Sequence, residues 1–204
     1  MSTIAMTPGF TYTKGMKKKD DSKAQKILDA AAQIILTQGV TNLSTIKIAK
    51  NVGIAQSNVY AYFENKQTLL TNLYERELNR IDQFDDFASV LTSEHALNTR
   101  IEAYVHAVCH YAVTNPDSLT LIEAIKSIDT IEPSVAERQT KITSLLNEGI
   151  EQGYLKPVPI NLMLATVFHI AHQHGLNIQN HQYTRDTYPL EKIENMILDA
   201  IKVV

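Results

Sequence analysis

The chain has 204 residues, of which 44% are hydrophobic and 20% are charged, and its net charge at pH 7 is −3. This length suits one large domain or a small domain on a larger one. A single cysteine, Cys109, excludes an internal disulfide, no signal peptide is recognisable, and no apolar run approaches the roughly 20 residues of a membrane-spanning helix, so we expect a soluble, cytoplasmic protein.

The charges are unevenly distributed along the chain. Residues 14–80 contain eleven basic and six acidic residues, a net charge of +5, whereas residues 81–204 contain eight basic and sixteen acidic residues, a net charge of −8. Solubility alone could produce such an asymmetry, but a basic N-terminal part also favours a polyanionic partner. The charges therefore indicate two parts with different tasks.

The first 19 residues show no periodic apolar pattern. Pro8, Gly9 and Gly15 interrupt this stretch, which predicts a flexible tail over residues 1–19. Lys17–Lys19 could form a basic arm that reaches DNA, or simply a solvated end of the tail.

A helix is predicted from Asp21 or Ser22 until Gly39, and a loop follows over residues 39–42. Either of the first two residues can cap the helix, and glycine commonly ends one. The helix is expected to bury one apolar face, formed by Ile27, Ala31, Ile34 and Ile35.

Residues 44–63 have the pattern of two short helices joined by a glycine turn. Ser44 can cap the first helix, Ala49 is small where two helices must cross, and Gly53 supplies the turn. This is the pattern of a helix-turn-helix, a common DNA-binding unit. We expect the apolar positions to pack on a third helix; these are Ile46, Val52, Ile54, Val59 and Phe63. The polar positions should stay available to DNA; these are Gln56, Ser57, Asn58, Tyr60 and Tyr62.

A long helix is predicted next, because Asn65 ends the second short helix and Lys66 falls in the first turn of a new helix that reaches about Asp85. The predicted organisation is a DNA-binding domain over residues 20–66, a connecting helix over 67–85 and a helical body over 86–204.

A series of spaced positions runs from the first helix into the long helix, namely Gly39-Val40, Ser44-Thr45-Ile46, Ile48-Ala49, Gly53-Ile54, Val59-Tyr60, Tyr62-Phe63, Asn65-Lys66 and Leu69-Leu70. This order of residues resembles the tetracycline-repressor (TetR) family over roughly residues 22–75. The resemblance implies an N-terminal three-helix DNA-binding head, a two-fold dimer and a helical C-terminal body that senses a small molecule, usually to relieve repression. Ala55 departs from the pattern, since the family usually has Ser or Thr before its reading helix.

The remainder of the chain is a series of amphipathic helices, so the predicted fold class is all-α. The last two helices carry wide apolar faces, which either complete the core of one subunit or, as the family resemblance implies, form a four-helix bundle with a second copy. The predicted helices are Ala96–Thr114, Asp117–Ser127, Ser134–Gly153, Ile160–Asn180 and Thr187–Val203.

Two sets of candidate site residues follow. For DNA, side-chain amides can bond adenine edges, so Gln56 and Asn58 are the candidates for sequence preference. The family resemblance implies backbone or base contacts for Tyr60 and Tyr62, and phosphate contacts for Lys66 and Thr45. The full DNA set is Ser44, Thr45, Gln56, Ser57, Asn58, Tyr60, Tyr62 and Lys66. A pocket for an unknown effector is expected among Tyr104, His106, Tyr111, Ile122, Met163, Phe168 and His172, although any of these could simply be packing.

His106, Cys109 and His110 fall on one face of a helix and could hold zinc or nickel. Histidines on helices are more often buried or interfacial, so we expect no metal and no cofactor. Enzyme motifs such as His-Glu-x-x-His, Gly-x-Ser-x-Gly or a phosphate-binding loop are missing from the sequence. The predicted function is a dimeric repressor released from a palindromic operator by a small molecule; the alternative is a helical ligand or metal sensor without sequence-specific DNA binding.

Overall fold

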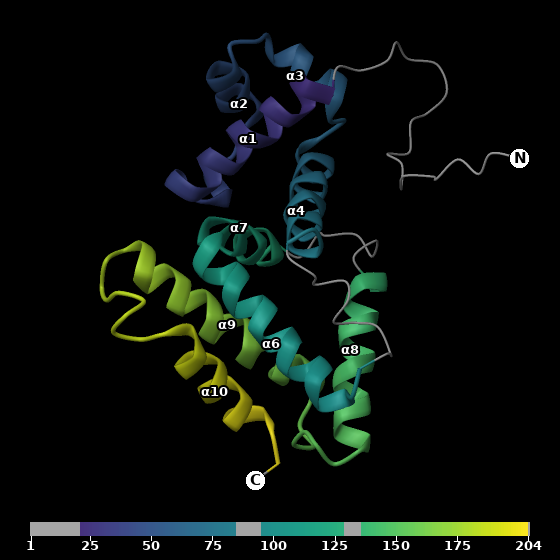
Figure 1. Ribbon diagram of the computed structural model, residues 1–204. Coiled ribbons are helices and arrows are strands. Elements are labelled where there is room, and N and C mark those ends of the chain that lie inside the picture. Colours follow the sequence, from purple (N-terminus) through teal and green to yellow (C-terminus); the bar gives the residue numbers. More distant parts are fainter. Residues whose placement is uncertain (1–20, 85–94, 129–135, 204) are drawn as a thin grey trace, which may run out of the picture.

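The computed structural model describes residues 21–84, 95–128 and 136–203, so the predicted tail over residues 1–19 lies outside the described part. The described residues form nine α-helices and one short 3₁₀ helix (Figure 1), and the all-α prediction is confirmed. None of the described helices is long and apolar enough to cross a bilayer. In chain order the elements are α1 (Asp21–Gln38), η1 (Val40–Asn42), α2 (Thr45–Val52), α3 (Gln56–Tyr62), α4 (Lys66–Asp82), α6 (Leu97–Thr114), α7 (Pro116–Lys126), α8 (Ala136–Glu151), α9 (Ile160–Gln179) and α10 (Leu190–Ile201).

Helices α1, α2 and α3 form a compact head. The predicted apolar face of α1 is buried, with Ile27 and Ala31 fully inaccessible to solvent. Ser44 caps α2, and Gly53 ends it with a φ of 74°, a left-handed conformation that glycine adopts without strain. Val59 on α3 is also fully buried. The helix-turn-helix geometry therefore follows from one cap, one glycine and one anchoring residue.

The expectation that Ile46 packs inside the head is wrong, because Ile46 is 65% exposed. The residues of α2 that face the core are Ile48 and Ala49. Two residues correspond to about 200° around a helix, so Ile46 lies nearly opposite Ile48. Its side chain therefore belongs to the outer surface of the head.

Two other helices differ from prediction at their ends. Helix α4 ends at Asp82 rather than near Asp85. Helix α10 begins at Leu190 rather than Thr187, with Pro189 at the position that caps its start. Proline favours the beginning of a helix because it has no N–H group to donate to a preceding turn.

The body is organised around α6, which packs against α7, α8, α9 and α10. Helices α6 and α9 approach closely at Gly175, where an added Cβ would lie 2.2 Å from the carbonyl oxygen of Ala112. Helix α4 leads from the head to the body, and α7 lies beneath α1 and beside the lower part of α4 (Figure 1), in contact with both. The junction between head and body is therefore formed by α1, α4 and α7.

Candidate DNA interface and ligand cavity

Helix α3 presents its polar residues outward. Gln56, Ser57 and Asn58 are exposed at the start of the helix, and Tyr60 is 49% exposed. Val59 and Phe63 lie on the opposite side and are buried against the head. This arrangement leaves one face of the helix free to enter a DNA groove.

Three of the predicted DNA-contacting side chains are hydrogen-bonded to one another. Gln56 donates from Nε2 to Oγ1 of Thr45 over 2.9 Å, and the same oxygen lies 3.2 Å from the hydroxyl of Tyr60. These bonds join α2 to α3 and hold the three side chains in one orientation. Ser44 Oγ instead accepts a bond from the backbone N–H of Lys47 over 3.3 Å, so in the free protein Ser44 caps its helix.

Lys66 is the first residue of α4, next to the capping residue Asn65, whose Oδ1 accepts from the Thr68 N–H over 2.8 Å. The Lys66 ammonium lies 3.4 Å from the carbonyl oxygen of Val40, beside η1. Tyr62 is half-buried and packs against the core, so less of it is available than of Tyr60. All of these DNA assignments stay predictions.

Two further features of this surface concern Ile46, whose exposure the sequence did not indicate, and Ala55, whose departure from the TetR pattern it did. Ile46 exposes an apolar side chain next to Thr45, where it could contact a thymine methyl. Ala55, at the start of α3, makes no side-chain capping bond, so the departure from the TetR pattern leaves α3 without that stabilisation.

The body contains a cavity of about 540 Å³ between α4, α6, α7, α8 and α9. Four of the predicted ligand residues line it, namely Tyr104, Tyr111, Ile122 and Phe168. A volume of this size suits a small organic molecule.

The other three predicted ligand residues lie outside the cavity lining. His106 is 61% exposed at its side chain and pairs with Glu194 over 2.8 Å. Met163 is buried in the core. His172 is buried behind the lining, where its Nε2 lies 2.9 Å from the Thr120 hydroxyl. Which face of a helix is apolar could be read from the sequence, but how far that face stands from its neighbours could not.

The geometry around Cys109 does not favour metal binding. Burial raises the pKa of its thiol to about 12, so the thiolate that metals require is scarce at neutral pH. His106 points to Glu194 instead. Across the described residues, no group of three or more His, Cys, Asp or Glu side chains is arranged to hold a metal ion.

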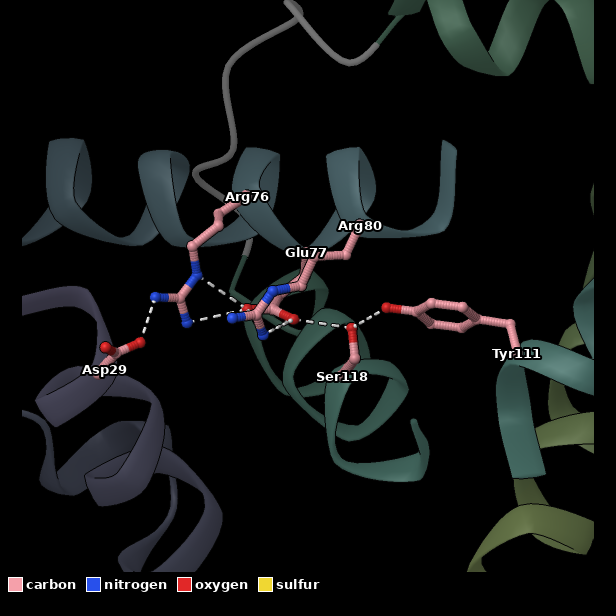
Figure 2. A network of polar contacts seen from close by, with 6 residues as sticks. All are labelled: Asp29, Arg76, Glu77, Arg80, Tyr111 and Ser118. Atoms are coloured by element: carbon pink, nitrogen blue, oxygen red, sulfur yellow. Dashed lines mark hydrogen bonds and ion pairs between the residues drawn. The ribbon is translucent and has the colours of Figure 1, made fainter. Parts of the chain in front are cut away.

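A buried ionic network connects the cavity wall to the head (Figure 2). Glu77 on α4 is fully buried, and its carboxylate accepts bonds from Arg76 Nε (3.0 Å), Arg80 Nη1 (3.0 Å) and Ser118 Oγ (2.7 Å). Two guanidinium groups and a hydroxyl therefore compensate the loss of water around this charge.

The network extends in both directions from Glu77, as Figure 2 shows. Arg76 Nη1 donates to Asp29 on α1 over 2.7 Å, and the Tyr111 hydroxyl donates to Ser118 Oγ over 2.7 Å. Burial raises the pKa of Tyr111, so this hydroxyl keeps the proton that it donates. Since Tyr111 also lines the cavity, an unbroken series of polar contacts runs from the cavity to the first helix of the head.

Comparisons with known proteins agree with this architecture. The family model described as "Bacterial regulatory proteins, tetR family" matches residues 27–73, from α1 into α4. The fatty acid metabolism regulator protein of Bacillus subtilis (strain 168) is 33% identical over 153 residues, which cover 68% of this chain and 74% of that protein.

Solved structures show the same similarity. A transcription regulator from Lactobacillus plantarum is 42% identical with a TM-score of 0.80, and the match covers 88% of this chain and 98% of that one. A TetR family transcription regulator from Marinobacter aquaeolei VT8 shares the fold with a TM-score of 0.75 at 22% identity, over 93% of this chain and 100% of that one. The matched head and the relatives that extend through the body place this chain in the TetR family of DNA-binding transcriptional regulators, which are not enzymes.

Proposed function

We propose that this regulator is a dimeric repressor that binds a palindromic operator and leaves it when a small molecule occupies the body cavity. The observation that carries the proposal is the surface of α3, where exposed Gln56, Ser57 and Asn58 stand above the buried anchor Val59. Polar side chains at the start of a firmly packed helix are how helix-turn-helix proteins read the major groove.

Within this surface we assign two roles. Gln56 and Asn58 read base edges, since a side-chain amide can donate to and accept from adenine at once. Lys66 and Thr45, near the starts of α4 and α2, contact phosphates. Base contacts set sequence preference, whereas phosphate contacts set affinity for any sequence.

A second copy of the chain is proposed to pack on α9 and α10. Leu162 on α9 and Met196 on α10 are 56% and 49% exposed, and the two helices pack against each other. Covering these side chains removes apolar surface from water. A two-fold dimer also places two α3 helices on one face, which matches two half-sites of a palindrome.

The cavity and the Glu77 network together support control by a ligand. Tyr111 belongs to both, so a molecule that displaces its ring alters the bond to Ser118 and hence the surroundings of Glu77. Because Arg76 joins Glu77 to α1, the orientation of the head depends on these contacts. A ligand that prefers one orientation shifts the population toward it.

The DNA proposal is tested by selection from a random duplex library, followed by salt titration on the winning sequence. We expect a palindrome and a steep decrease of affinity with salt. Lys66→Ala should weaken binding to all sequences alike and flatten the salt dependence, whereas Asn58→Ala should change the preferred bases. Identical behaviour of the two variants would contradict the assignment, and failure to enrich any sequence would favour the alternative of a helical sensor without sequence-specific DNA binding.

The dimer proposal has a separate test. The double variant Leu162→Lys, Met196→Lys should sediment as a monomer and lose palindrome binding, while its head remains folded. A matched change in the head, Lys23→Met at an exposed lysine of α1, should leave the dimer intact. A wild-type protein that sediments as a monomer at micromolar concentration would contradict this part of the proposal.

A further inference from the structure

Helices α7 and α9 run antiparallel along one side of the cavity, and polar side chains pair across the line where they meet. We call this line the α7–α9 seam. The pairs, in order along α7, are Asp117 with Gln179 (2.8 Å), Thr120 with His172 (2.9 Å) and Glu123 with His169 (3.3 Å). Residues three apart on α7 thus find partners along one side of α9, first seven and then three residues apart.

The next position on α7 breaks this series. Lys126 follows Glu123 by three residues, is exposed and lines the cavity. Asn161, also exposed, lines the cavity from the first turn of α9. Within the described residues, Lys126 has neither a hydrogen bond nor an ion pair, and no acidic residue of α9 lies at this end of the seam. The seam therefore leaves a positive charge at the edge of the cavity.

The interior of the cavity is different. Leu119, Ile122, Leu164 and Phe168 supply apolar walls. The Tyr111 hydroxyl on this wall already donates to Ser118. An uncharged, apolar group is therefore the favoured occupant of the interior, because a polar group there would lose water without gaining a new partner.

We propose that the cavity binds an elongated apolar molecule that ends in an anionic group, such as a carboxylate, with the apolar part in the interior and the anion against Lys126. This inference rests on the proposal that the cavity is the effector site. Asn161 offers an amide N–H as a second donor at the same end. The anionic group of the ligand thus pairs with Lys126, for which α9 has no acidic residue.

The neighbouring Glu123 does not reverse this preference. Its two carboxylate oxygens face Nδ1 of His169 at 3.3 Å and Nδ1 of His172 at 3.2 Å. Both oxygens thus have partners in the seam. A cationic head group would meet the ammonium of Lys126, so the site disfavours amines.

The test uses three probes with the same ten-carbon chain: decanoate and decylammonium, each kept below its micelle concentration, and decanol, kept below its solubility limit. Because the protein has no tryptophan, binding is followed by calorimetry and by displacement of an apolar fluorescent dye. The intact protein is compared with Lys126→Met, with Lys126→Arg, and with Lys23→Met as a control at an exposed lysine of α1 in the head. Lys126→Arg keeps the positive charge that also favours the last turn of α7.

We expect decanoate to bind wild-type protein about fivefold more tightly than decanol, the upper range for an exposed ion pair, and decylammonium to bind most weakly. Lys126→Met should remove the preference for decanoate without changing decanol binding, while Lys126→Arg and Lys23→Met retain it. High salt should reduce the preference.

Equal binding of decanoate and decanol, or a preference that survives Lys126→Met, would overturn the anionic head group while leaving the effector site in place. Failure of all three probes to bind would overturn both the anionic head group and the proposal that the cavity is the effector site. Binding that follows the expected order but does not release the selected operator would support the ligand class and contradict ligand-controlled repression.

Discussion

The DNA-reading surface of the head and the cavity of the body are built in opposite ways. Every predicted DNA contact lies between Ser44 and Lys66, on three helices joined by short turns. The cavity lining spans residues 74–169 and comes from five helices. The first surface therefore depends on caps and turns, which act locally, whereas the second depends on how closely distant helices pack. Changes at helix caps of the head should therefore have small, local costs, whereas changes at buried contacts between distant helices should have larger ones.

The largest effect is expected at the junction of the two parts. Glu77→Ala should lower the free energy of unfolding by about 3 kcal/mol, because it removes the buried acceptor shared by Arg76, Arg80 and Ser118. Arg76 then keeps only its bond to Asp29, and the buried Ser118 hydroxyl loses its acceptor. Urea unfolding followed by circular dichroism measures the change. The control Glu64→Ala, at an exposed residue of the head, should stay within about 0.5 kcal/mol of wild type; equal effects would contradict the importance of the network.

The next effect separates close packing from backbone conformation in the body. Gly175→Ala should cost about 2 kcal/mol, since its Cβ would lie 2.2 Å from the Ala112 oxygen and the α6 and α9 backbones must separate. Gly153→Ala meets no atom within 4 Å but has a φ of 71°, so we expect only about 1 kcal/mol from backbone strain. Thermal unfolding compares the two, and the reverse order would exclude a tight α6–α9 contact.

In the head, two changes at helix caps should have opposite signs. Ser44→Ala should cost about 1 kcal/mol, because it removes the acceptor for the Lys47 N–H. Ala55→Ser should add a similar stabilisation, since Ala55 has an extended backbone at the start of α3 and no capping side chain. Thermal unfolding again measures both. Destabilisation by Ala55→Ser would show that the environment of α3 rejects the hydroxyl.

The smallest effect depends on pH and belongs to the body. Burial, with a smaller contribution from Arg185, lowers the pKa of His174, whose Nδ1 lies 3.0 Å from the Tyr183 hydroxyl. The unfolded chain then takes up a proton more readily than the folded one, so stability falls as the pH drops through and below about 6.5. His174→Gln should flatten the dependence of unfolding free energy on pH between 7 and 5. An unchanged slope would assign the dependence to other groups, among them His172, whose pKa burial also lowers.

The sequence predicted the helices well and their inner faces unevenly. The long helices repeat their apolar pattern over several turns, so their order and most of their ends were predictable. Helix α2 has only eight residues, too few turns to show that Ile46 points outward. Met163 and His172 were expected in the ligand pocket, but they lie in the packed interior rather than at the cavity. The apolar pattern of a helix shows which of its faces points inward, but it does not show how far that face lies from the neighbouring helices.

The sequence alone determined the all-helical fold, the helix-turn-helix and its glycine turn, because each depends on residues a few positions apart. Tertiary structure alone decided that Glu77 is buried. Between Arg76 and Arg80 it has the sequence context of an exposed glutamate, yet it is fully buried and accepts a hydrogen bond from Ser118 of α7, to which Tyr111 of α6 donates in turn. The α7–α9 seam and the lack of a partner for Lys126 among the described residues were decided in the same way, because the partner of a charged side chain depends on which helices, distant in sequence, pack together.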